Sequence, residues 1–169
     1  LPSAITGTTS VCEGATTVLS NTTGGGMSWT SSNTSVATIG STSGVVTGIA
    51  AGTTDITYTL TTGCQVKTIV SVNGLPEAIG GTLFTCTGNT TTLTNATSGG
   101  TWSSSNTLRG TVDATTGVVT GISAGNITIT YRLTTGCFKT LGWFLRVGYI
   151  NFMISEISGL ILLYNVRVL

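Results

Sequence analysis

The stretch "NITITYRL" at residues 126–133 decides the fold of this chain, because apolar and polar side chains alternate along it. An extended chain points successive side chains to opposite faces, so a period of two predicts a β-strand with one buried and one solvated face. Residues 55–60, "DITYTL", carry the same pattern. The side chains predicted to face a core are Ile56, Tyr58, Leu60, Ile127, Ile129, Tyr131 and Leu133.

These two strands belong to a tandem repeat. Residues 29–64 and 102–137 are identical at 23 of 36 positions, at an offset of 73. Nearer the start, "LPSAITGTTSVCEG" (1–14) is matched by "LPEAIGGTLFTCTG" (75–88) at an offset of 74. The one-residue difference falls in the glycine run at 24–26, where a surface loop tolerates a deletion.

Short alternating runs separated by Gly, Asn and Ser recur within each copy, and this spacing is typical of an all-β sandwich. We predict two tandem sandwiches, at residues 1–73 and 74–147, followed by an atypical apolar tail at 148–169. Trp29 and Trp102 occupy equivalent middle strands and are expected between the sheets. Further strands are expected in the first copy at 16–20, 27–31, 45–49 and 67–72.

The composition argues against several functions. Charged residues make up 7% of the chain, against about 25% in an ordinary soluble domain, and the net charge is only +1. Without a basic face the chain should not bind nucleic acid. There is no His, and the five acids lie far apart in sequence, so we expect no catalytic site, no metal and no cofactor. The acids are Glu13, Asp55, Glu77, Asp113 and Glu156.

The four cysteines are widely spaced and form no CxxC pair. An even number in a hydroxyl-rich chain favours disulfides in an exported protein over a zinc site, with free thiols as the alternative. The cysteines are Cys12, Cys64, Cys86 and Cys137.

Two long stretches, "WTSSNTSVATIGSTSGVVTGIAAGTTDITYTL" (29–60) and "WSSSNTLRGTVDATTGVVTGISAGNITITYRL" (102–133), carry a resemblance to a known family. Both are similar to the bacterial immunoglobulin-like group 2 domain, with its Trp-Ser-Ser-Asn strand, Gly-Val-Val-Thr-Gly segment and Thr-Ile-Thr strand. The similarity covers residues 1 to about 140. The second copy departs from the family pattern at Leu108, Arg109 and Gly110, where the family has Val-Ala in a short strand.

The resemblance implies immunoglobulin-like sandwiches repeated along secreted or cell-surface bacterial proteins, including intimin- and invasin-like adhesins. Most copies in such proteins form the stalk, so the first expectation is a spacer whose partners are neighbouring repeats. The alternative is a module that binds a glycan or a host protein through inter-strand loops such as 22–27 and 95–101. We expect an extracellular chain that is a piece of a longer one, because it begins at Leu1 without an export signal.

The repeat also suggests a disulfide pattern. Cys12 and Cys86 occupy equivalent places early in the two copies, and Cys64 and Cys137 occupy equivalent places before the last strand. If these positions meet at one end of each sandwich, the bridges are Cys12–Cys64 and Cys86–Cys137.

After Thr140 the threonine-rich character of the chain stops. A membrane span would need about 20 apolar residues, and polar residues interrupt the tail too often, so we expect no span. A second interpretation takes residues 141–147, whose apolar side chains alternate, as a substitute for the closing strand at 67–72. A third is a changed reading frame, because the codons for Trp143 and Phe144 contain a Val codon in another frame. If residues 141–147 close the sheet, we expect the residues beyond 147 to be extended or hairpin-like, and either poorly packed or lying against the second copy.

Overall fold

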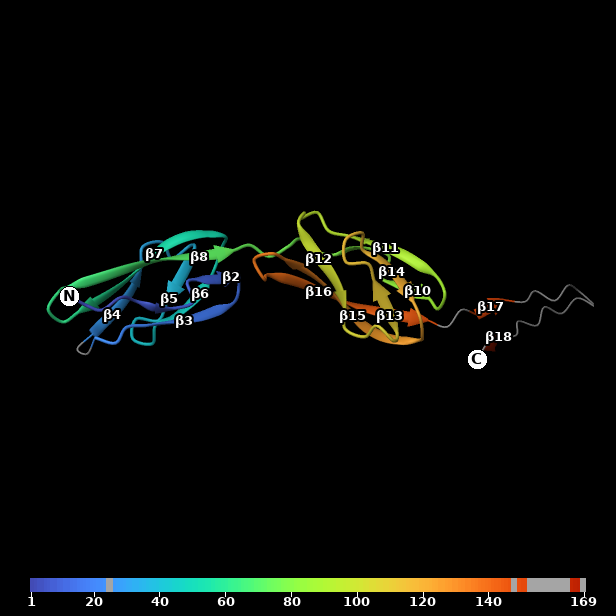
Figure 1. Ribbon diagram of the computed structural model, residues 1–169, viewed down its shortest axis with the longest axis horizontal. Helices are drawn as coiled ribbons and strands as arrows, with labels where there is room; N and C mark the ends of the chain where they lie inside the picture. The colour runs from blue at the N-terminus through green and yellow to red at the C-terminus, as the bar shows by residue number, and fades with distance from the viewer. Residues whose placement is uncertain (24–25, 147–148, 152–164, 168–169) are drawn as a thin grey trace, which may run out of the picture. The chain divides into compact units, whose positions relative to one another are not determined.

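The computed structural model describes residues 1–23, 26–146, 149–151 and 165–167, and it divides into two compact units (Figure 1). Unit 1 comprises Leu1–Leu75 together with Thr135–Cys137, and unit 2 comprises Pro76–Thr134 together with Phe138–Leu169. Every regular element among the described residues is a β-strand, and no helix occurs in them. The all-β prediction is therefore confirmed.

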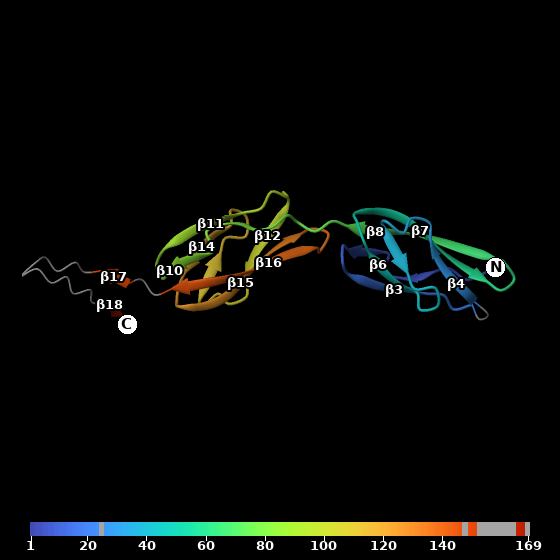
Figure 2. The same cartoon turned by 180° about the vertical axis from the view of Figure 1, so that it is seen from behind.

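Unit 1 is built from two four-stranded sheets (Figures 1 and 2). One sheet has the order β1-β3-β6-β5 and the other has the order β2-β8-β7-β4. The strands of the first are β1 (Thr6–Gly7), β3 (Thr16–Ser20), β6 (Val45–Gly48) and β5 (Ala37–Ile39). Those of the second are β2 (Ser10–Cys12), β8 (Gln65–Asn73), β7 (Gly52–Leu60) and β4 (Gly26–Ser31).

Unit 2 repeats this arrangement with sheets of order β13-β14-β11-β9 and β10-β16-β15-β12. The first contains β9 (Gly80–Gly81), β11 (Thr90–Thr94), β13 (Gly110–Val112) and β14 (Val118–Gly121). The second contains β10 (Phe84–Cys86), β12 (Gly100–Ser104), β15 (Gly125–Leu133) and β16 (Phe138–Arg146). All strands expected from sequence alternation are present, and β13 forms where the family pattern is interrupted.

One pairing in each unit was not expected from the sequence. The short strand β2 runs parallel to the end of β8, with Cys12 beside Asn73. Strand β10 runs parallel to the end of β16, with Cys86 beside Arg146. The hairpin pairs β7–β8 and β15–β16 are antiparallel, as a short turn requires. The parallel pairs fix which end of the sandwich each cysteine occupies.

A separate apolar core lies between the sheets of each unit, as expected for packed sheets with alternating residues. Both cores contain a Trp opposite a Tyr on the neighbouring strand. The ring centroids lie 4.6 Å apart for Trp29–Tyr58 and also 4.6 Å apart for Trp102–Tyr131. The nine predicted core residues are confirmed, with Leu60 and Leu133 packed at the margin of the clusters.

The Gly-Val-Val-Thr-Gly segment has a steric reason for its first glycine. Gly117 adopts a positive φ of 72°, a conformation that side chains rarely tolerate. A Cβ atom there would also lie 2.7 Å from the carbonyl oxygen of Leu93 and 3.1 Å from the Trp102 ring. The glycine therefore lets the turn between β13 and β14 close against the core.

The interpretation of residues 141–147 as a closing strand is confirmed for residues 141–146, and residue 147 lies outside the described residues. Residues 138–145 of β16 pair with β15, as residues 65–72 of β8 pair with β7. Trp143 and Leu145 are buried, at 1% and 4% exposure, so the predicted alternation places them in the core. Of the predicted apolar tail, only β17 (Tyr149–Asn151) and β18 (Asn165–Arg167), which pair antiparallel, lie within the described residues.

The closing strand of unit 2 is bulkier than that of unit 1. By strand register, Trp143 takes the place of Val70 and Leu145 takes the place of Val72. A smaller residue accompanies the change, because Gly110 in β13 stands where unit 1 has the buried Ala37. A Cβ atom on Gly110 would lie 2.9 Å from Leu145 Cδ1 and 3.0 Å from Ile127 Cδ1.

This exchange of volume predicts a coupling between Gly110 and Leu145. Gly110→Ala should destabilise unit 2 by about 1–3 kcal/mol, because it overpacks the core. Leu145→Val alone should cost about 1 kcal/mol through lost burial. The double variant, which restores the Ala37–Val72 pair of unit 1, should lose less than the sum of the two. Urea denaturation of the four proteins measures this, and simple additivity would refute the coupling.

A second prediction concerns the indole of Trp143. Among the described residues its Nε1 is the buried side-chain polar atom that has no hydrogen-bond partner. An unpaired buried donor costs about 1–3 kcal/mol. Trp143→Phe removes that donor, and this gain should offset the packing contacts that the smaller ring loses. The free energy of unfolding should therefore change by less than about 1 kcal/mol. Trp143→Ala should cost about 3–5 kcal/mol. Similar losses for both variants in denaturant melts would show that the indole N–H is satisfied.

Candidate functional site

The cysteines are the candidate site residues, and the structure pairs them differently from the prediction. Cys12 and Cys137 form a disulfide with a Cα–Cα distance of 5.7 Å. Cys64 and Cys86 are free thiols. The predicted bridges Cys12–Cys64 and Cys86–Cys137 are therefore wrong for this structure. We call Cys12 and Cys86 the strand cysteines, and Cys64 and Cys137 the turn cysteines.

The parallel pairing of β2 with β8 explains the correction. Cys12 lies beside Asn73, the last residue of β8, whereas Cys64 directly precedes Gln65, the first residue of the same strand. A nine-residue strand spans roughly 30 Å at about 3.3 Å per residue. A disulfide allows at most about 7 Å between Cα atoms. The two cysteines of unit 1 are therefore at opposite ends of the sandwich and cannot bond to each other.

The same geometry separates the cysteines of the second repeat. Cys86 lies beside Arg146 at the end of β16, and Cys137 directly precedes Phe138 at its start. The turn residues Thr135–Cys137 belong by their contacts to unit 1, although the strands on either side of the turn belong to unit 2. The bridge therefore joins the strand cysteine of one repeat to the turn cysteine of the following repeat.

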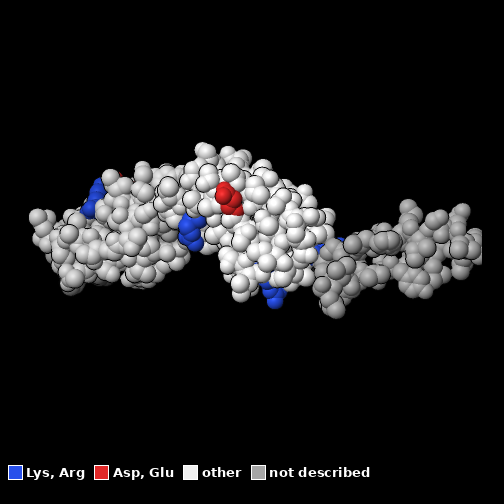
Figure 3. Space-filling model, turned by 45° about the vertical axis from the view of Figure 1, so that its right-hand side comes forward, with Lys and Arg blue, Asp and Glu red and all other residues white. Residues whose placement is uncertain are grey.

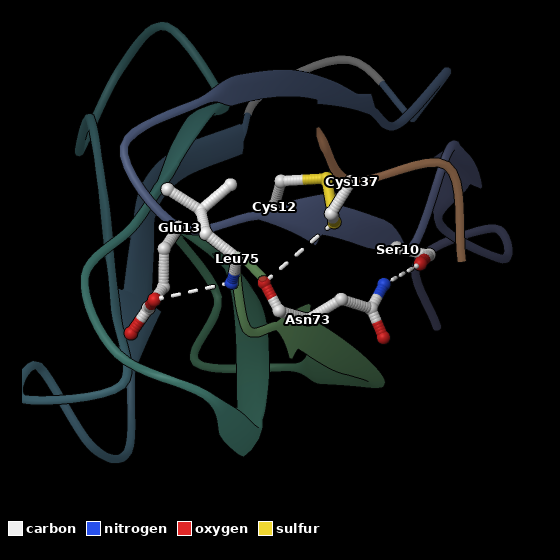
Figure 4. Close-up of a disulfide and its surroundings, with 6 residues drawn as sticks. All are labelled: Ser10, Cys12, Glu13, Asn73, Leu75 and Cys137. Carbon is white, nitrogen blue, oxygen red and sulfur yellow. Dashed lines mark hydrogen bonds between the residues drawn. A yellow bond between two sulfur atoms is a disulfide. The ribbon is translucent and has the colours of Figure 1, made fainter. Parts of the chain in front are cut away.

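Polar contacts hold the residues around the disulfide (Figure 4). Asn73 donates from Nδ2 to Ser10 Oγ over 2.7 Å, which ties the end of β8 to the start of β2. The carbonyl oxygen of Asn73 lies 3.8 Å from Cys137 Sγ. Glu13 accepts from the backbone N–H of Ala51 at 3.2 Å and from that of Leu75 at 3.4 Å. These contacts fix the backbone that carries Cys12 in unit 1.

The lack of a catalytic or metal site stays a prediction. Glu13 and Asp113 are engaged by backbone groups of neighbouring loops. In the part of the chain that the structure describes, no group of three metal-binding side chains occurs. Glu156 lies outside the described residues. Charged side chains stand apart from one another on the face seen in Figure 3.

Asp113 is a turn residue, as its position suggests. Its carboxylate accepts from the backbone N–H of Thr116 at 2.7 Å, from the Thr116 hydroxyl at 2.8 Å and from the N–H of Thr115 at 3.1 Å. These hydrogen bonds, the one from the Thr116 backbone first, lower the pKa of Asp113 below its ordinary value. The charged carboxylate therefore stabilises the turn between β13 and β14.

The loop at 95–101, proposed as a binding loop, is tied to its own domain. Asn95 donates from Nδ2 to the carbonyl of Glu77 at 2.7 Å, and Thr97 Oγ1 accepts from the Glu77 N–H at 3.0 Å. Tyr131 donates its hydroxyl to the Thr97 carbonyl at 2.7 Å and accepts from the N–H of Gly100 at 2.9 Å. The loop's polar groups are largely used within the fold.

Unit 1 repeats this loop structure. Asn21 donates from Nδ2 to the carbonyl of Ser3 at 2.6 Å, and Thr23 Oγ1 accepts from the Ser3 N–H at 2.7 Å. Tyr58 donates its hydroxyl to the Thr23 carbonyl at 3.3 Å. Of the proposed binding loop 22–27, residues 24 and 25 lie outside the described residues. Sequence reasoning missed this tyrosine-to-loop anchor, although the matching Asn-x-Thr in both copies was visible.

A shallow hollow lies in unit 1 beside the Trp–Tyr pair. Its volume is about 280 Å³, and its lining includes Ser41, Thr42 and Ser43 from one turn. Asn21, which lines the hollow, already holds the loop that follows it. Trp29 lines the hollow but is 6% exposed, so it offers little ring surface for stacking.

The described residues include no helix long and apolar enough to cross a bilayer.

The cysteine pairing predicts a labelling pattern. Iodoacetamide applied to the folded, non-reduced protein should modify Cys64, which is exposed, and more slowly Cys86, which is half-buried. Cys12 and Cys137 should react only after reduction, because disulfide sulfurs are not nucleophilic thiols. Peptide mapping by mass spectrometry identifies the modified sites. Labelled Cys137 with protected Cys64 in the same sample would contradict the structure.

Comparison with known proteins supports the fold. Residues 84–140 match the family model for the bacterial Ig-like domain (group 2), so the predicted family resemblance is confirmed for the second repeat. No curated protein matches the chain. The chain is similar to the C-terminal 282-residue fragment of intimin, solved with the intimin-binding domain of its translocated receptor, with a TM-score of 0.53 and 16% identity.

The similarity to the intimin fragment covers 84% of this chain and 63% of that fragment, and at this identity it shows the immunoglobulin-like fold alone. Two weaker similarities are to domains 4 and 5 of the S-layer protein SbsC and to a SusE-like surface polysaccharide-binding protein of Bacteroides thetaiotaomicron. The first has a TM-score of 0.38, with 18% identity over 86% of this chain and 98% of that one. The second has a TM-score of 0.42, with 10% identity over 89% of this chain and 34% of that one.

Proposed function

We propose that this chain is a spacer segment of a secreted or cell-surface bacterial protein, in which immunoglobulin-like repeats follow one another and present another domain. The single observation that carries the proposal is the Cys12–Cys137 bond. It links two successive repeats of the sequence, and a bond of this kind stabilises an array in which repeats follow one another. A disulfide also favours an oxidising, extracytoplasmic location.

The way the loops are held supports the same proposal. In each unit an Asn side chain, a Thr hydroxyl and a Tyr hydroxyl hold the loop before β4 or β12 against the start of the same repeat. A binding loop keeps polar groups available for its ligand, whereas these groups stabilise the domain. With few charged residues and a net charge of +1, the chain has little electrostatic field with which to steer a charged partner, which fits a passive spacer.

The competing function is a module that binds a glycan or a host protein. The hollow beside Trp29 and Tyr58 is the observation that favours it, because hydroxyl-bearing residues of the turn at 41–43 and two aromatic residues line the same hollow. Against it stand the burial of the Trp29 ring and the hydrogen bonds already made by Asn21. We therefore place the binding module second.

A display experiment separates the two functions. The full chain is placed between a cell-surface anchor and an epitope tag, and antibody access to the tag is measured. Substitution of exposed loop residues by Thr42→Glu and Ser98→Glu should leave access unchanged. Trp29→Ala should lower it, because loss of the buried ring costs about 3–5 kcal/mol and unfolds much of unit 1.

The same variants are then applied to a glycan array and to host extracellular proteins. The spacer proposal expects no specific binding by the full chain. Specific binding that Thr42→Glu or Ser98→Glu abolishes, with the thermal unfolding temperature unchanged, would assign the chain to the binding class instead.

A further inference from the structure

We propose that each of the two free cysteines forms a disulfide with a cysteine of a neighbouring repeat, in the same way that Cys12 bonds to Cys137. Cys86 would form a disulfide with the turn cysteine of a following repeat, and Cys64 would form one with the strand cysteine of a preceding repeat. Each repeat would then be joined to both neighbours by disulfides as well as by the peptide chain. This inference deepens the proposed spacer function. It rests on that function only in one respect, which is that such repeats follow one another in an array.

The first support is the backbone around the two strand cysteines, which is the same in both units. In unit 1 the carbonyl of Cys12 accepts from Ala15 N at 3.0 Å, and Gly14 N donates to the carbonyl of Gly48 at 2.9 Å. In unit 2 the equivalent bonds run from Asn89 to Cys86 at 3.1 Å and from Gly88 to Gly121 at 2.9 Å.

The anchor to the closing strand is also reproduced. The N–H of the residue after Cys12 donates to the carbonyl of Asn73 at 3.0 Å, and the N–H of the residue after Cys86 donates to the carbonyl of Arg146 at 3.0 Å. Both strand cysteines sit at the same register of a parallel pair. The backbone therefore holds Cys86 in the frame that holds Cys12 in its disulfide.

The second support is the turn that carries each turn cysteine. Residues 61–64 and 134–137 have the identical sequence Thr-Thr-Gly-Cys. The glycine has a positive φ in both turns, 80° at Gly63 and 90° at Gly136. Both turns connect antiparallel nine-residue strands. The Cys64 turn is thus the same structural element as the turn that delivers Cys137 to Cys12.

The third support is access. Cys64 is exposed, whereas its bonded counterpart Cys137 is 1% exposed. Cys86 lines a hollow of about 480 Å³ together with Phe84 and Asn89. Phe84 is 52% exposed although it is a large apolar residue, and the Arg146 guanidinium lies 5.5 Å from its ring centre. An incoming turn at Cys86 would have a surface to cover.

The bond would form by thiol–disulfide exchange. The Cys86 thiolate attacks a small disulfide such as oxidised glutathione, which forms a mixed disulfide and releases one glutathione thiolate. The Cys64 thiolate of the second molecule then attacks the Cys86 sulfur and displaces the other glutathione. Two protein thiols are oxidised to one disulfide, and one oxidised glutathione is reduced to two thiols.

The test uses two matched single variants of the full chain. Cys64→Ser keeps only the strand thiol Cys86, and Cys86→Ser keeps only the turn thiol Cys64. One variant is labelled with heavy nitrogen, and the two are mixed at about 1 mM, near the effective concentration that a short tether provides, in a glutathione redox buffer. Non-reducing gels and mass spectrometry then count mixed and like-with-like dimers.

The proposal expects the mixed dimer, carrying a Cys64–Cys86 bridge, to exceed the two like dimers together several-fold. Mixed and like dimers in random proportion, no dimers, or a Cys64–Cys86 bridge inside monomers of the wild-type chain would overturn it. Unchanged Cys12–Cys137 linkage and unchanged thermal unfolding confirm that each variant is folded. None of these outcomes tests the spacer proposal, which depends on the display experiment. Failure of the disulfide inference and failure of the spacer proposal are therefore distinguishable.

Discussion

The parallel pairing of a short early strand with the far end of the closing strand is the constraint on which the cysteine chemistry of this protein depends. It places Cys12 beside Asn73 and Cys86 beside Arg146, while the turn cysteines precede the same closing strands at their other ends. Because a nine-residue strand separates them by roughly 30 Å, no repeat can close its own bridge. A disulfide in this fold must therefore take its second sulfur from another repeat.

The sequence was sufficient for the fold because its alternation is local and redundant. Ile56 and Ile129 are both fully buried, as a period of two in a repeated sequence predicts, and Trp29 and Trp102 lie in the cores as expected. The disulfide prediction was wrong for a different reason. Equivalent positions in a repeat show which residues share an environment, but they do not show which end of a strand that environment occupies. Only the pairing of β2 with β8 supplies that direction.

The closing strand of unit 2 shows that alternation of apolar residues can complete the sheet without the residues that unit 1 uses. None of the core residues that β8 contributes recurs in β16, yet Trp143 and Leu145 are buried at the register of Val70 and Val72. The added volume is met partly by Gly110, which replaces Ala37. The indole N–H has no such compensation among the described residues. Apolar alternation is enough to complete the sheet, while polar satisfaction depends on details that alternation does not specify.

A bridge between repeats has a mechanical consequence that a bridge within one repeat lacks. Cys12 and Cys137 are 125 positions apart in sequence, so a force transmitted through the bond bypasses most of both repeats. A pull applied to the two ends of the chain passes through the bond, and the residues between the two cysteines cannot be drawn out even if a sandwich opens. A bond closing a single repeat would protect only that repeat. Because an opened sandwich exposes its core to proteases, a bond that bypasses the residues between Cys12 and Cys137 limits how far an opened sandwich can be drawn out.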